Sequence, residues 1–306
     1  MEKTYIFGHK NPDTDSIVSS LIMTNLEKTL GNDGAIACRT GRVNKESEYV
    51  LNYVGVEPPI LIENLEAGSE VIVVDTANEK ELPDNINDLK IKKIVDHHYV
   101  ALNTSYPLYY RAEPVGCTST IMYKLYKENN VKIDKTIATL MLSAIISDTL
   151  LFKSPTCTDE DVKAVKELAL IADIDYEKYG MDMLKAGTDL SSFSIEEILN
   201  LDSKEKSIKE VKTIVAQVNT ACIPDVMKMQ KELEEGINKI IEEKELDLFV
   251  FLITDIVNSN SQVIALGKRA DLVEKSYGVK LENNTALLKG IVSRKKQVIP
   301  VLTENA

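Results

Sequence analysis

The chain has 306 residues, of which 44% are hydrophobic and 27% charged, proportions that are usual for a globular protein. Its formal net charge of −12 argues against nonspecific nucleic-acid binding, which needs a broad basic surface. No apolar run approaches the length of a membrane span, and the start, MEKTYIFGHK, lacks the pattern of a secretory signal. We therefore expect a cytoplasmic protein that binds neither nucleic acid nor membrane.

The first 188 residues alternate short apolar runs with helical stretches, a pattern that predicts an α/β fold with a mainly parallel sheet. In chain order we predict a strand over 4–8, a helix over 16–30, strands over 70–77 and 90–98, and helices over 118–130 and 134–149. Ligands of open parallel sheets bind beyond the carboxyl ends of the strands. His9, Asp75 and His97 each follow such an end.

The polar stretch GTDLSSFS interrupts this pattern and predicts a linker over 189–194. It would separate a first domain over 1–188 from a second over 195–306. In the second domain we predict strands over 211–218, 246–256 and 262–268, one long helix over about 225–244, and two β-like apolar runs that flank Arg294, Lys295 and Lys296.

The four cysteines, Cys38, Cys117, Cys157 and Cys222, stand alone in the sequence. Without CxxC pairs, neither a disulfide framework nor a structural zinc site is expected. We interpret them as small, buried apolar residues.

All three histidines lie beside aspartates at the ends of apolar runs. The segment GHKNPDTDS places His9, Asp13 and Asp15 at a predicted strand-to-helix turn, where an aspartate could instead cap the helix. The partner clusters favour a metal site over a cap alone.

Three further aspartates are candidate metal ligands: Asp75, Asp96 and Asp148. Asp75 ends one apolar run, where a lone aspartate is usually a turn residue, whereas Asp96 is followed directly by His97 and His98. Asp148 interrupts a strongly apolar helix, so its carboxylate must be paired, coordinated or at an edge.

Five carboxylates and three imidazoles exceed what one ion needs, which predicts two ions that share a bridging carboxylate. Mixed nitrogen and oxygen donors suit Mn²⁺, Co²⁺, Fe²⁺ or Zn²⁺ better than Mg²⁺ alone. Two ions about 3.5 to 4 Å apart can activate a water for attack on phosphorus. The predicted reaction is hydrolysis of a phosphate compound.

An anionic substrate also needs cations, and Arg294-Lys295-Lys296 is the compact basic candidate in this acidic chain. The alternative for this run is a solvated hairpin turn. Lys204, shortly after the predicted linker, is a weaker candidate that composition alone would class as a surface lysine.

These motifs resemble those of the manganese-dependent family II inorganic pyrophosphatases in the DHH phosphoesterase superfamily. The resemblance runs essentially end to end and depends on GHKNPDTDS, VIVVDTA, VDHH, LSAIISDTLLF and NNTALLKGIVSRKKQ. DHH alone would indicate only the superfamily, whereas HKNPDTDS and SRKKQ together are far more specific. The resemblance implies a doubly wound, mainly parallel DHH domain and a smaller mixed-sheet α/β domain of DHHA2 type.

The resemblance also implies the ligands of two metals that share Asp75. One metal would be held by His9, Asp13 and Asp75, and the other by Asp15, Asp75, His97 and Asp148. The resemblance further implies two Mn²⁺ per subunit, for which Co²⁺ can substitute, additional Mg²⁺ with the substrate, and a homodimer.

On the substrate side, the residues that match the family's phosphate-contacting groups are His98, Lys204, Arg294 and Lys295. Asp96 would orient the strand end, and Lys296 would assist binding or hold the loop. The implied reaction is hydrolysis of pyrophosphate to two phosphates, with a metal-bridging hydroxide attacking phosphorus in line in a cleft between the domains, which would close over the substrate.

Two rival functions are weaker. One is another DHH phosphoesterase, acting on oligoribonucleotides, cyclic dinucleotides or polyphosphate. Those that act on nucleotides usually carry a GGGH-type stretch and need aromatic residues for base stacking, but this chain has no such stretch and only 6% aromatic residues. A phosphate-binding protein without turnover would lack a bridging ligand or a cation, but Asp75, Arg294 and Lys295 are all present.

Overall fold

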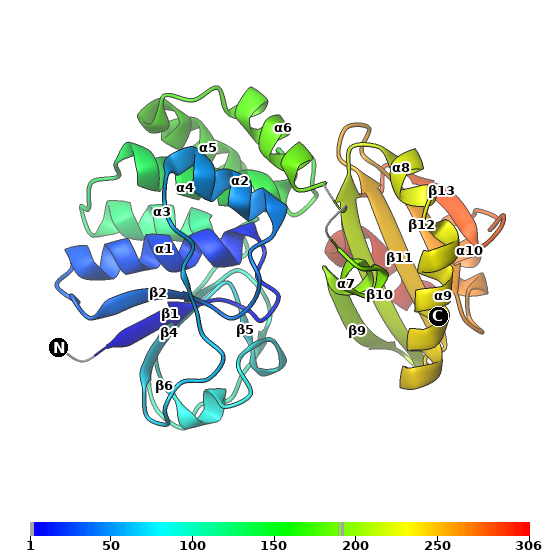
Figure 1. The fold of residues 1–306 in the computed structure, drawn as a ribbon, viewed down its shortest axis with the longest axis horizontal. Coiled ribbons are helices and arrows are strands. Elements are labelled where there is room, and N and C mark those ends of the chain that lie inside the picture. The colour runs from blue at the N-terminus through cyan, green and yellow to red at the C-terminus, as the bar shows by residue number, and fades with distance from the viewer. Residues whose placement is uncertain (1–2, 189, 191–192) are drawn as a thin grey trace. The chain divides into compact units, whose positions relative to one another are not determined.

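The computed structural model describes residues 3–188, 190 and 193–306. The chain divides into two compact units, Met1–Ala186 and Gly187–Ala306, each with its own sheet (Figure 1). Of the predicted linker over 189–194, residues 189, 191 and 192 lie outside the described residues. Among the described residues, no helix is long and apolar enough to cross a membrane.

The first unit is built on a six-stranded sheet in which every neighbouring pair is parallel. Its order is β3-β2-β1-β4-β6-β8. The strands are β1 (Thr4–Phe7), β2 (Ala35–Arg39), β3 (Ile60–Leu61), β4 (Glu70–Val74), β6 (Lys90–Asp96) and β8 (Tyr109–Ala112). A separate pair joins β5 (Ala77–Asn78) to β7 (Val100–Ala101). The predicted strands over 4–8, 70–77 and 90–98 contain β1, β4 and β6.

Among the described residues of this unit there are six α-helices, and α1, α3 and α4 lie on one side of the sheet in Figure 1. They are α1 (Thr14–Thr29), α2 (Lys45–Val54), α3 (Thr118–Glu128), α4 (Lys135–Thr149), α5 (Asp159–Ala172) and α6 (Tyr176–Ala186). Alternate side chains of β1 and β4, among them Phe7 and Val73, pack instead with Leu82 and Ile86 from a segment of short 3₁₀ turns.

The second unit holds a mixed five-stranded sheet, ordered β13-β12-β11-β10-β9. Only β10 and β11 pair in parallel. The strands are β9 (Ser203–Ile208), β10 (Val211–Thr220), β11 (Leu248–Asp255), β12 (Asn260–Leu266) and β13 (Thr285–Lys289). Every residue of β11 is buried, as expected for a central strand covered on both faces. The predicted α/β class, with a parallel sheet followed by a smaller mixed sheet, is confirmed.

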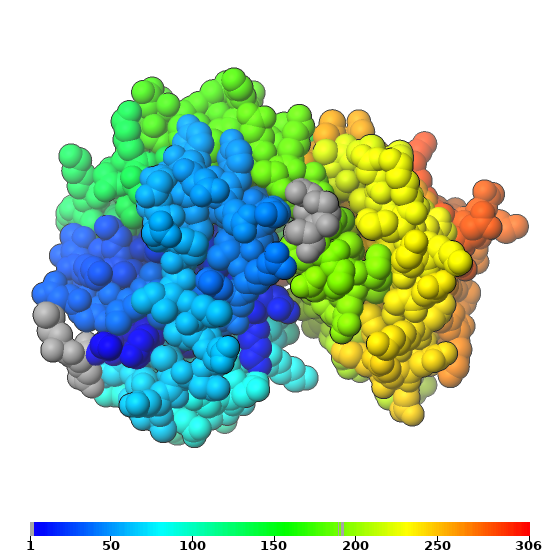
Figure 2. All heavy atoms as spheres, viewed as in Figure 1, coloured from blue at the N-terminus to red at the C-terminus, as the bar shows by residue number. Residues whose placement is uncertain are grey.

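In the described part of the second unit, five α-helices accompany the sheet: α7 (Ile195–Asn200), α8 (Ile223–Met227), α9 (Gln230–Lys244), α10 (Asp271–Tyr277) and α11 (Ile299–Asn305). Leu233 and Ile237 of α9 pack into a core with β10 and β11. The opposite side of α9 is charged and lies at the surface, in yellow in Figure 2. An amphipathic helix of this kind is stabilised mainly by burial of its apolar stripe.

Two predictions for the second unit are wrong. The single long helix over about 225–244 is instead α8 and α9, because Met229 adopts a non-helical backbone and starts a new helix. The apolar run after Lys296 is not β-like but forms α11, with Pro300 in the first turn, where its missing N–H costs nothing.

The cysteine interpretation is correct only in part. Cys38 and Cys117 are buried and Cys157 is half-buried, but Cys222 is exposed. Cys222 immediately precedes α8, a short helix at the surface.

Candidate metal centre

The strand order reverses direction at the boundary between β1 and β4. β2 and β3 continue the sheet on one side of β1, and β4, β6 and β8 continue it on the other. Such a reversal opens a crevice at the carboxyl ends of the two central strands. His9 follows β1 and Asp75 follows β4, so both side chains begin at this position.

The β1–α1 turn is built around a close contact between Gly8 and Ser16. A Cβ on Gly8 would lie 1.9 Å from the Ser16 hydroxyl oxygen, so only glycine fits. That hydroxyl accepts a hydrogen bond from the His9 backbone N–H at 3.1 Å. Asp13 is the N-cap of α1, accepting from the Ser16 N–H at 3.0 Å, so the capping interpretation of this aspartate is correct as well.

Asp15 lies in the first turn of α1 and is fully buried. Its Oδ1 accepts hydrogen bonds from the hydroxyls of Ser19, at 2.7 Å, and Ser119, at 2.9 Å. Its Oδ2 accepts from the backbone N–H of Thr118 at 2.8 Å. Three donors from α1 and α3 thus fix the direction of this carboxylate.

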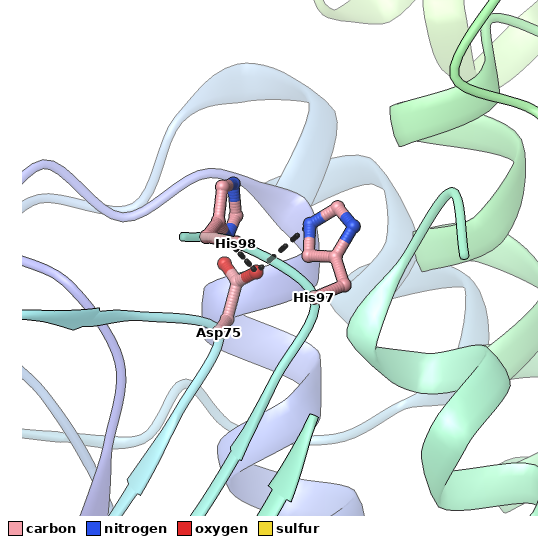
Figure 3. Close-up of side chains that lie close together, drawn as sticks. All are labelled: Asp75, His97 and His98. Atoms are coloured by element: carbon pink, nitrogen blue, oxygen red, sulfur yellow. Dashed lines mark ion pairs between the residues drawn. The ribbon is translucent and has the colours of Figure 1, made fainter. Parts of the chain in front are cut away.

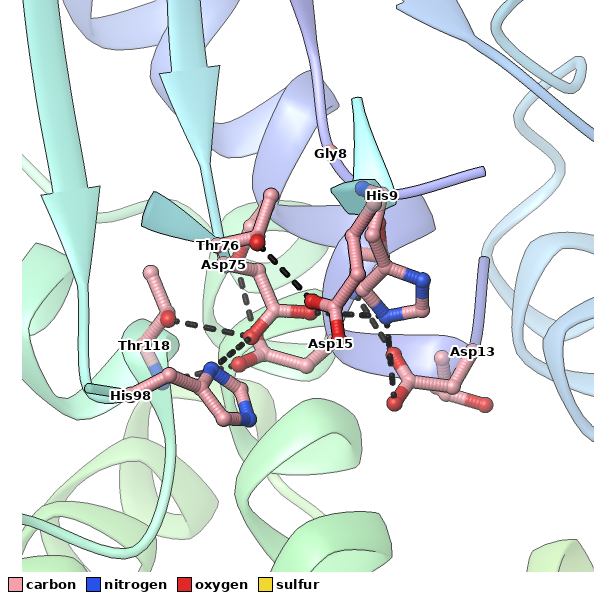
Figure 4. A network of polar contacts seen from close by, with 12 residues as sticks. Gly8, His9, Asp13, Asp15, Asp75, Thr76, His98 and Thr118 are labelled. Atoms are coloured by element: carbon pink, nitrogen blue, oxygen red, sulfur yellow. Dashed lines mark hydrogen bonds and ion pairs between the residues drawn. The ribbon is translucent and has the colours of Figure 1, made fainter. Parts of the chain in front are cut away.

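Asp75 lies at the centre of the polar network in Figure 4. Its backbone has a φ of 59°, a left-handed conformation that is uncommon outside glycine. Oδ1 accepts from the Thr118 hydroxyl at 3.2 Å, and Oδ2 lies 3.4 Å from His9 Nε2. Oδ2 is nevertheless buried without a hydrogen-bond partner among the described residues.

His97 and His98 follow β6, and both rings lie beside the Asp75 carboxylate (Figure 3). His97 Nε2 is 3.6 Å from Asp75 Oδ1, and His98 Nδ1 is 3.7 Å from the same atom. The Val115 carbonyl lies 3.0 Å from His97 Nδ1, and since a carbonyl can only accept, that nitrogen carries the proton. The lone pair of His97 is therefore on Nε2.

His98 makes a further pair of contacts with Asp96. Its Nδ1 lies 2.9 Å from Asp96 Oδ1, which also accepts from the His98 backbone N–H at 3.0 Å. Burial alone would raise the pKa of Asp96, but the hydrogen bonds and charge of His98 outweigh it and lower the pKa. Asp96 thus contacts His98 rather than the other carboxylates.

The donor atoms converge into three overlapping groups, within each of which all ligand atoms lie within 4.8 Å of one another. The groups are His9, Asp13 and Asp75; Asp15, Asp75, His97 and Asp148; and Asp75, His97 and His98. Asp75 belongs to all three. Asp148, near the end of α4, enters through Oδ2, which is 3.8 Å from His97 Nε2.

The carboxylates of these donor groups lie so close together that they shift one another's pKa values. Burial, followed by the charges of Asp15 and Asp13, raises the pKa of Asp75 to about 8. The same causes, together with Asp75, raise the pKa of Asp148 well above its usual value. Burial opposes the charged form of His9, but Asp13 and Asp75 outweigh it and raise the pKa of His9 to about 10.

The donor set fits divalent transition metals. A buried carboxylate oxygen without a partner, Asp75 Oδ2, lies among imidazole nitrogens and other carboxylates, and such mixed donors suit Mn²⁺ better than Mg²⁺ alone. Bound cations would also allow the crowded carboxylates to ionise together.

The predicted cations lie in the second unit. Arg294 begins a π-helical turn, Arg294–Val298, that follows Ser293 as N-cap, so the run is not a hairpin turn. The Arg294 guanidinium donates from Nη1 to the Asp202 backbone oxygen at 2.6 Å and pairs with the Asp202 carboxylate at 2.7 Å. Its Nε is buried without a partner among the described residues, while Lys295 is exposed.

Lys204 lies close in sequence to Asp202, the residue that pairs with Arg294. It lies near the start of β9, two residues after Asp202, opposite Val215 of β10. The start of β9 thus lies beside Arg294 in the second unit, and the following residues converge at one end of the first sheet: His9, Asp13, Asp15, Asp75, His97, His98 and Asp148.

Sequence reasoning missed the residues that orient the carboxylates. Thr118 and Ser119, at the start of α3, donate to Asp15 across more than 100 residues of sequence. The available signal was the run of small residues GCTST, whose last three residues begin the helix predicted over 118–130.

The fold and the donor cluster define a two-domain α/β protein with a candidate metal centre at the switch point of its parallel sheet. Residues 3–145 match the DHH family, N-terminal domain, and residues 181–305 match the DHHA2 domain.

Comparisons with known proteins agree with this class. The manganese-dependent inorganic pyrophosphatase of Bacillus subtilis is 55% identical over 308 aligned residues, and a probable manganese-dependent inorganic pyrophosphatase of Bacillus velezensis is 54% identical, each covering 99% of both chains. The crystal structure of a putative family II inorganic pyrophosphatase from Methanococcus jannaschii is 37% identical, with a TM-score of 0.85 over 99% of both chains. The chain belongs to the manganese-dependent inorganic pyrophosphatases of the DHH family.

Proposed function

We propose that this protein hydrolyses inorganic pyrophosphate to two phosphates at a dinuclear metal centre. The observation that carries the proposal is the sharing of the Asp75 carboxylate by separate groups of imidazole and carboxylate donors. A shared carboxylate between two convergent groups is the arrangement expected for two adjacent ions. The family relatives are named for the same reaction and the same metal.

In this proposal each metal takes one of the donor groups. The first is held by His9, Asp13 and Asp75, and the second by Asp15, Asp75, His97 and Asp148. When bound, two Mn²⁺ ions, or Co²⁺ in their place, would supply an activated bridging water for in-line attack on phosphorus and neutralise phosphate charge, with Mg²⁺ accompanying the substrate.

The protein's own groups position these reactants. The Val115 carbonyl holds His97 with its Nε2 lone pair toward Asp75. Asp96 orients the ring of His98, and in this proposal His98 contacts a phosphate oxygen of the substrate. Lys204, Arg294 and Lys295 would bind the remaining phosphate oxygens. The unpartnered Nε of Arg294 is a donor that a phosphate oxygen would satisfy.

In this proposal the predicted first domain, 1–188, supplies the metal ligands, and the predicted second domain, 195–306, supplies the substrate-binding lysines and arginine. Binding of one substrate by both domains would place the reaction in a cleft between them, and closure would exclude water from the phosphate.

We also propose a cytoplasmic homodimer assembled through β8. This edge strand presents unpaired backbone groups, and Tyr109 and Tyr110 on it are 43% and 41% exposed. Tyr99, immediately before β7, and Val100, in β7, are also exposed, at 53% and 56%. Exposed apolar side chains beside an edge strand favour pairing with a second copy.

The test is phosphate release from pyrophosphate by chelator-stripped protein reloaded with Mn²⁺, Co²⁺, Zn²⁺ or Mg²⁺. Tripolyphosphate and a dinucleotide serve as parallel substrates. Release from pyrophosphate that is fastest with Mn²⁺ or Co²⁺ is the expected result. Preference for the dinucleotide, or no release from any substrate by protein that has bound metal, would refute the proposed reaction.

A further inference from the structure

The segment 115–120 contacts three residues of the candidate metal centre. The Val115 carbonyl pairs with His97 Nδ1 at 3.0 Å, and Thr118 donates from its hydroxyl to Asp75 at 3.2 Å. The backbone of Thr118 and the hydroxyl of Ser119 bind the two oxygens of Asp15. All three belong to the four-residue donor group with Asp148, so this segment orients most of that group.

Asp161, in the first turn of α5, attaches the same segment to the rest of the unit. Its Oδ2 accepts from the Gly116 N–H at 2.9 Å, and its Oδ1 accepts from the Thr120 hydroxyl at 2.6 Å. Gly116 and Thr120 lie on either side of Thr118. The Asp161 side chain is 0% exposed. Asp161 therefore holds the segment on both sides of the residues that contact the metal ligands.

The contact between Asp161 and the segment leaves no spare room. A Cβ on Gly116 would lie 2.7 Å from Asp161 Oδ2 and 2.9 Å from the Thr149 methyl group. Because buried interiors transmit displacement rather than absorb it, a shift of the carboxylate moves the backbone at Gly116. The Val115 carbonyl that fixes the His97 tautomer is one residue away.

We propose that Asp161 is a positioning residue for the metal subsite formed by Asp15, Asp75, His97 and Asp148, acting through the segment 115–120. The inference rests on the metal centre of the proposed function. Asp161 touches neither metal nor substrate in this assignment. Its role is to hold Val115, Thr118 and Ser119 where they orient three ligands.

Asp161 also forms the capping box of α5 with Thr158, and this second role needs a control. Asp161 accepts from the Thr158 backbone N–H and hydroxyl, both at 2.7 Å. Thr158→Ala removes the cap hydroxyl but leaves the contacts of Asp161 with Gly116 and Thr120. It is the matched variant for loss of helix capping, which typically costs about 0.5 to 2 kcal/mol.

Two substitutions test the positioning role. Asp161→Ala removes the acceptors of Gly116 and Thr120, leaving a buried N–H unpaired. In Asp161→Asn the amide oxygen can still accept from Gly116, and the amide nitrogen can donate to the Thr120 hydroxyl, but these bonds lose their charge. The asparagine variant is therefore the conservative partner of the alanine variant.

The first measurement is a two-site Mn²⁺ titration of the chelator-stripped full chain, with circular dichroism to verify folding. Asp161→Ala should weaken one of two Mn²⁺ sites by about 10- to 100-fold, the usual effect of removing a residue that orients a ligand. Asp161→Asn should weaken the same site by a smaller factor, and Thr158→Ala should leave both affinities unchanged. The site formed by His9, Asp13 and Asp75 should be retained throughout.

The second measurement needs no metal. Imidazole ¹⁵N shifts of His97 should report the Nδ1–H tautomer in the unsubstituted protein and a mixture of tautomers in Asp161→Ala or, if that variant does not fold, a smaller change in Asp161→Asn. Unchanged affinities and tautomer in the folded variants, or equal losses in Thr158→Ala, would overturn the positioning role. Failure of the unsubstituted chain to bind Mn²⁺ would instead overturn the metal centre itself.

Discussion

The side-chain oxygen of Gln217 accepts a hydrogen bond from the backbone N–H of Arg294 at 3.1 Å, which ties the basic turn to the middle of β10. The amide nitrogen of the same glutamine donates to Thr254 and to the Val292 carbonyl, each at 3.0 Å. One neutral side chain on a rigid strand thus fixes the start of the turn that presents Arg294 and Lys295.

Gln217→Ala should therefore impair substrate binding without loss of metal. The substitution leaves the Arg294 N–H and the Val292 carbonyl without this partner, at about 1 to 3 kcal/mol for each buried group. We expect KM for pyrophosphate to rise about 10-fold or more, with unchanged Mn²⁺ stoichiometry. Steady-state kinetics and metal analysis check this. Bound Mn²⁺ that fell in step with activity would contradict a role confined to the substrate side.

Asp75→Asn should abolish turnover and weaken both metal sites. Asparagine keeps the shape of the side chain but removes the charge that both donor groups share. Activity should fall by more than about 100-fold, since even residues that only orient ligands contribute 10- to 100-fold. Asp84→Asn is the control, because Asp84 is an exposed aspartate whose side chain pairs only with Lys10 among the described residues. Near-normal turnover in Asp75→Asn would refute the bridging assignment.

Lys295→Ala should weaken substrate binding without affecting metal binding, because Lys295 belongs to the second unit and the proposed metal ligands belong to the first. Lys295 is exposed and lies far along the chain from every proposed metal ligand. Loss of one charged contact to phosphate should raise KM by about 10- to 100-fold, while the Mn²⁺ content stays at two per chain. Lys289→Ala, which changes an exposed lysine on β13, serves as the control. A large loss of Mn²⁺ in Lys295→Ala would argue against a purely substrate-side role.

Mn²⁺ binding should release protons at neutral pH. In the metal-free protein the pKa of Asp75 is raised to about 8 and that of His9 to about 10, so both groups hold a proton at pH 7 that a cation must displace. The pKa of Asp13 is lowered, because His9 outweighs the effect of burial, so Asp13 adds no proton. Affinity should therefore rise with pH over this range.

Calorimetric titration in buffers of different ionisation enthalpy measures this proton release. Between about pH 6 and pH 8 the number of protons released should fall as Asp75 ionises on its own, and Asp75→Asn should release about one proton fewer at pH 7. Binding of Mn²⁺ at pH 7 with no proton release would contradict these protonation states.

Much of the first domain could be predicted from local pattern. The run at β4 is apolar because both of its faces are covered, whereas β6 is continuously buried only in its second half, from Ile94 to Asp96. Each strand is followed by the polar residues that a strand end of a parallel sheet exposes to a ligand. His9, Asp75 and His97 were therefore identifiable as neighbours from the order of strands and polar residues along the chain. Asp148 was identifiable because a carboxylate in an apolar helix needs a partner.

The residues that orient the metal ligands, and the exact helix boundaries, depend on contacts between distant parts of the chain that no local sequence pattern indicates. Ser119 binds Asp15 across 104 residues and Gly116 binds Asp161 across 45, and serines and glycines at helix starts are too common to indicate such partners. The break at Met229 likewise carries no Gly or Pro at the break itself, so the helical pattern continued through it.

The sharing of one carboxylate also determines how the protein would respond to metal supply. The first cation to bind would displace the proton of Asp75, and a second would then meet a carboxylate that is already ionised and oriented. The proton of Asp75 would thus oppose binding of the first ion only, so the affinity for that ion should depend more strongly on pH than the affinity for the second. The dependence of activity on manganese concentration would therefore change with pH.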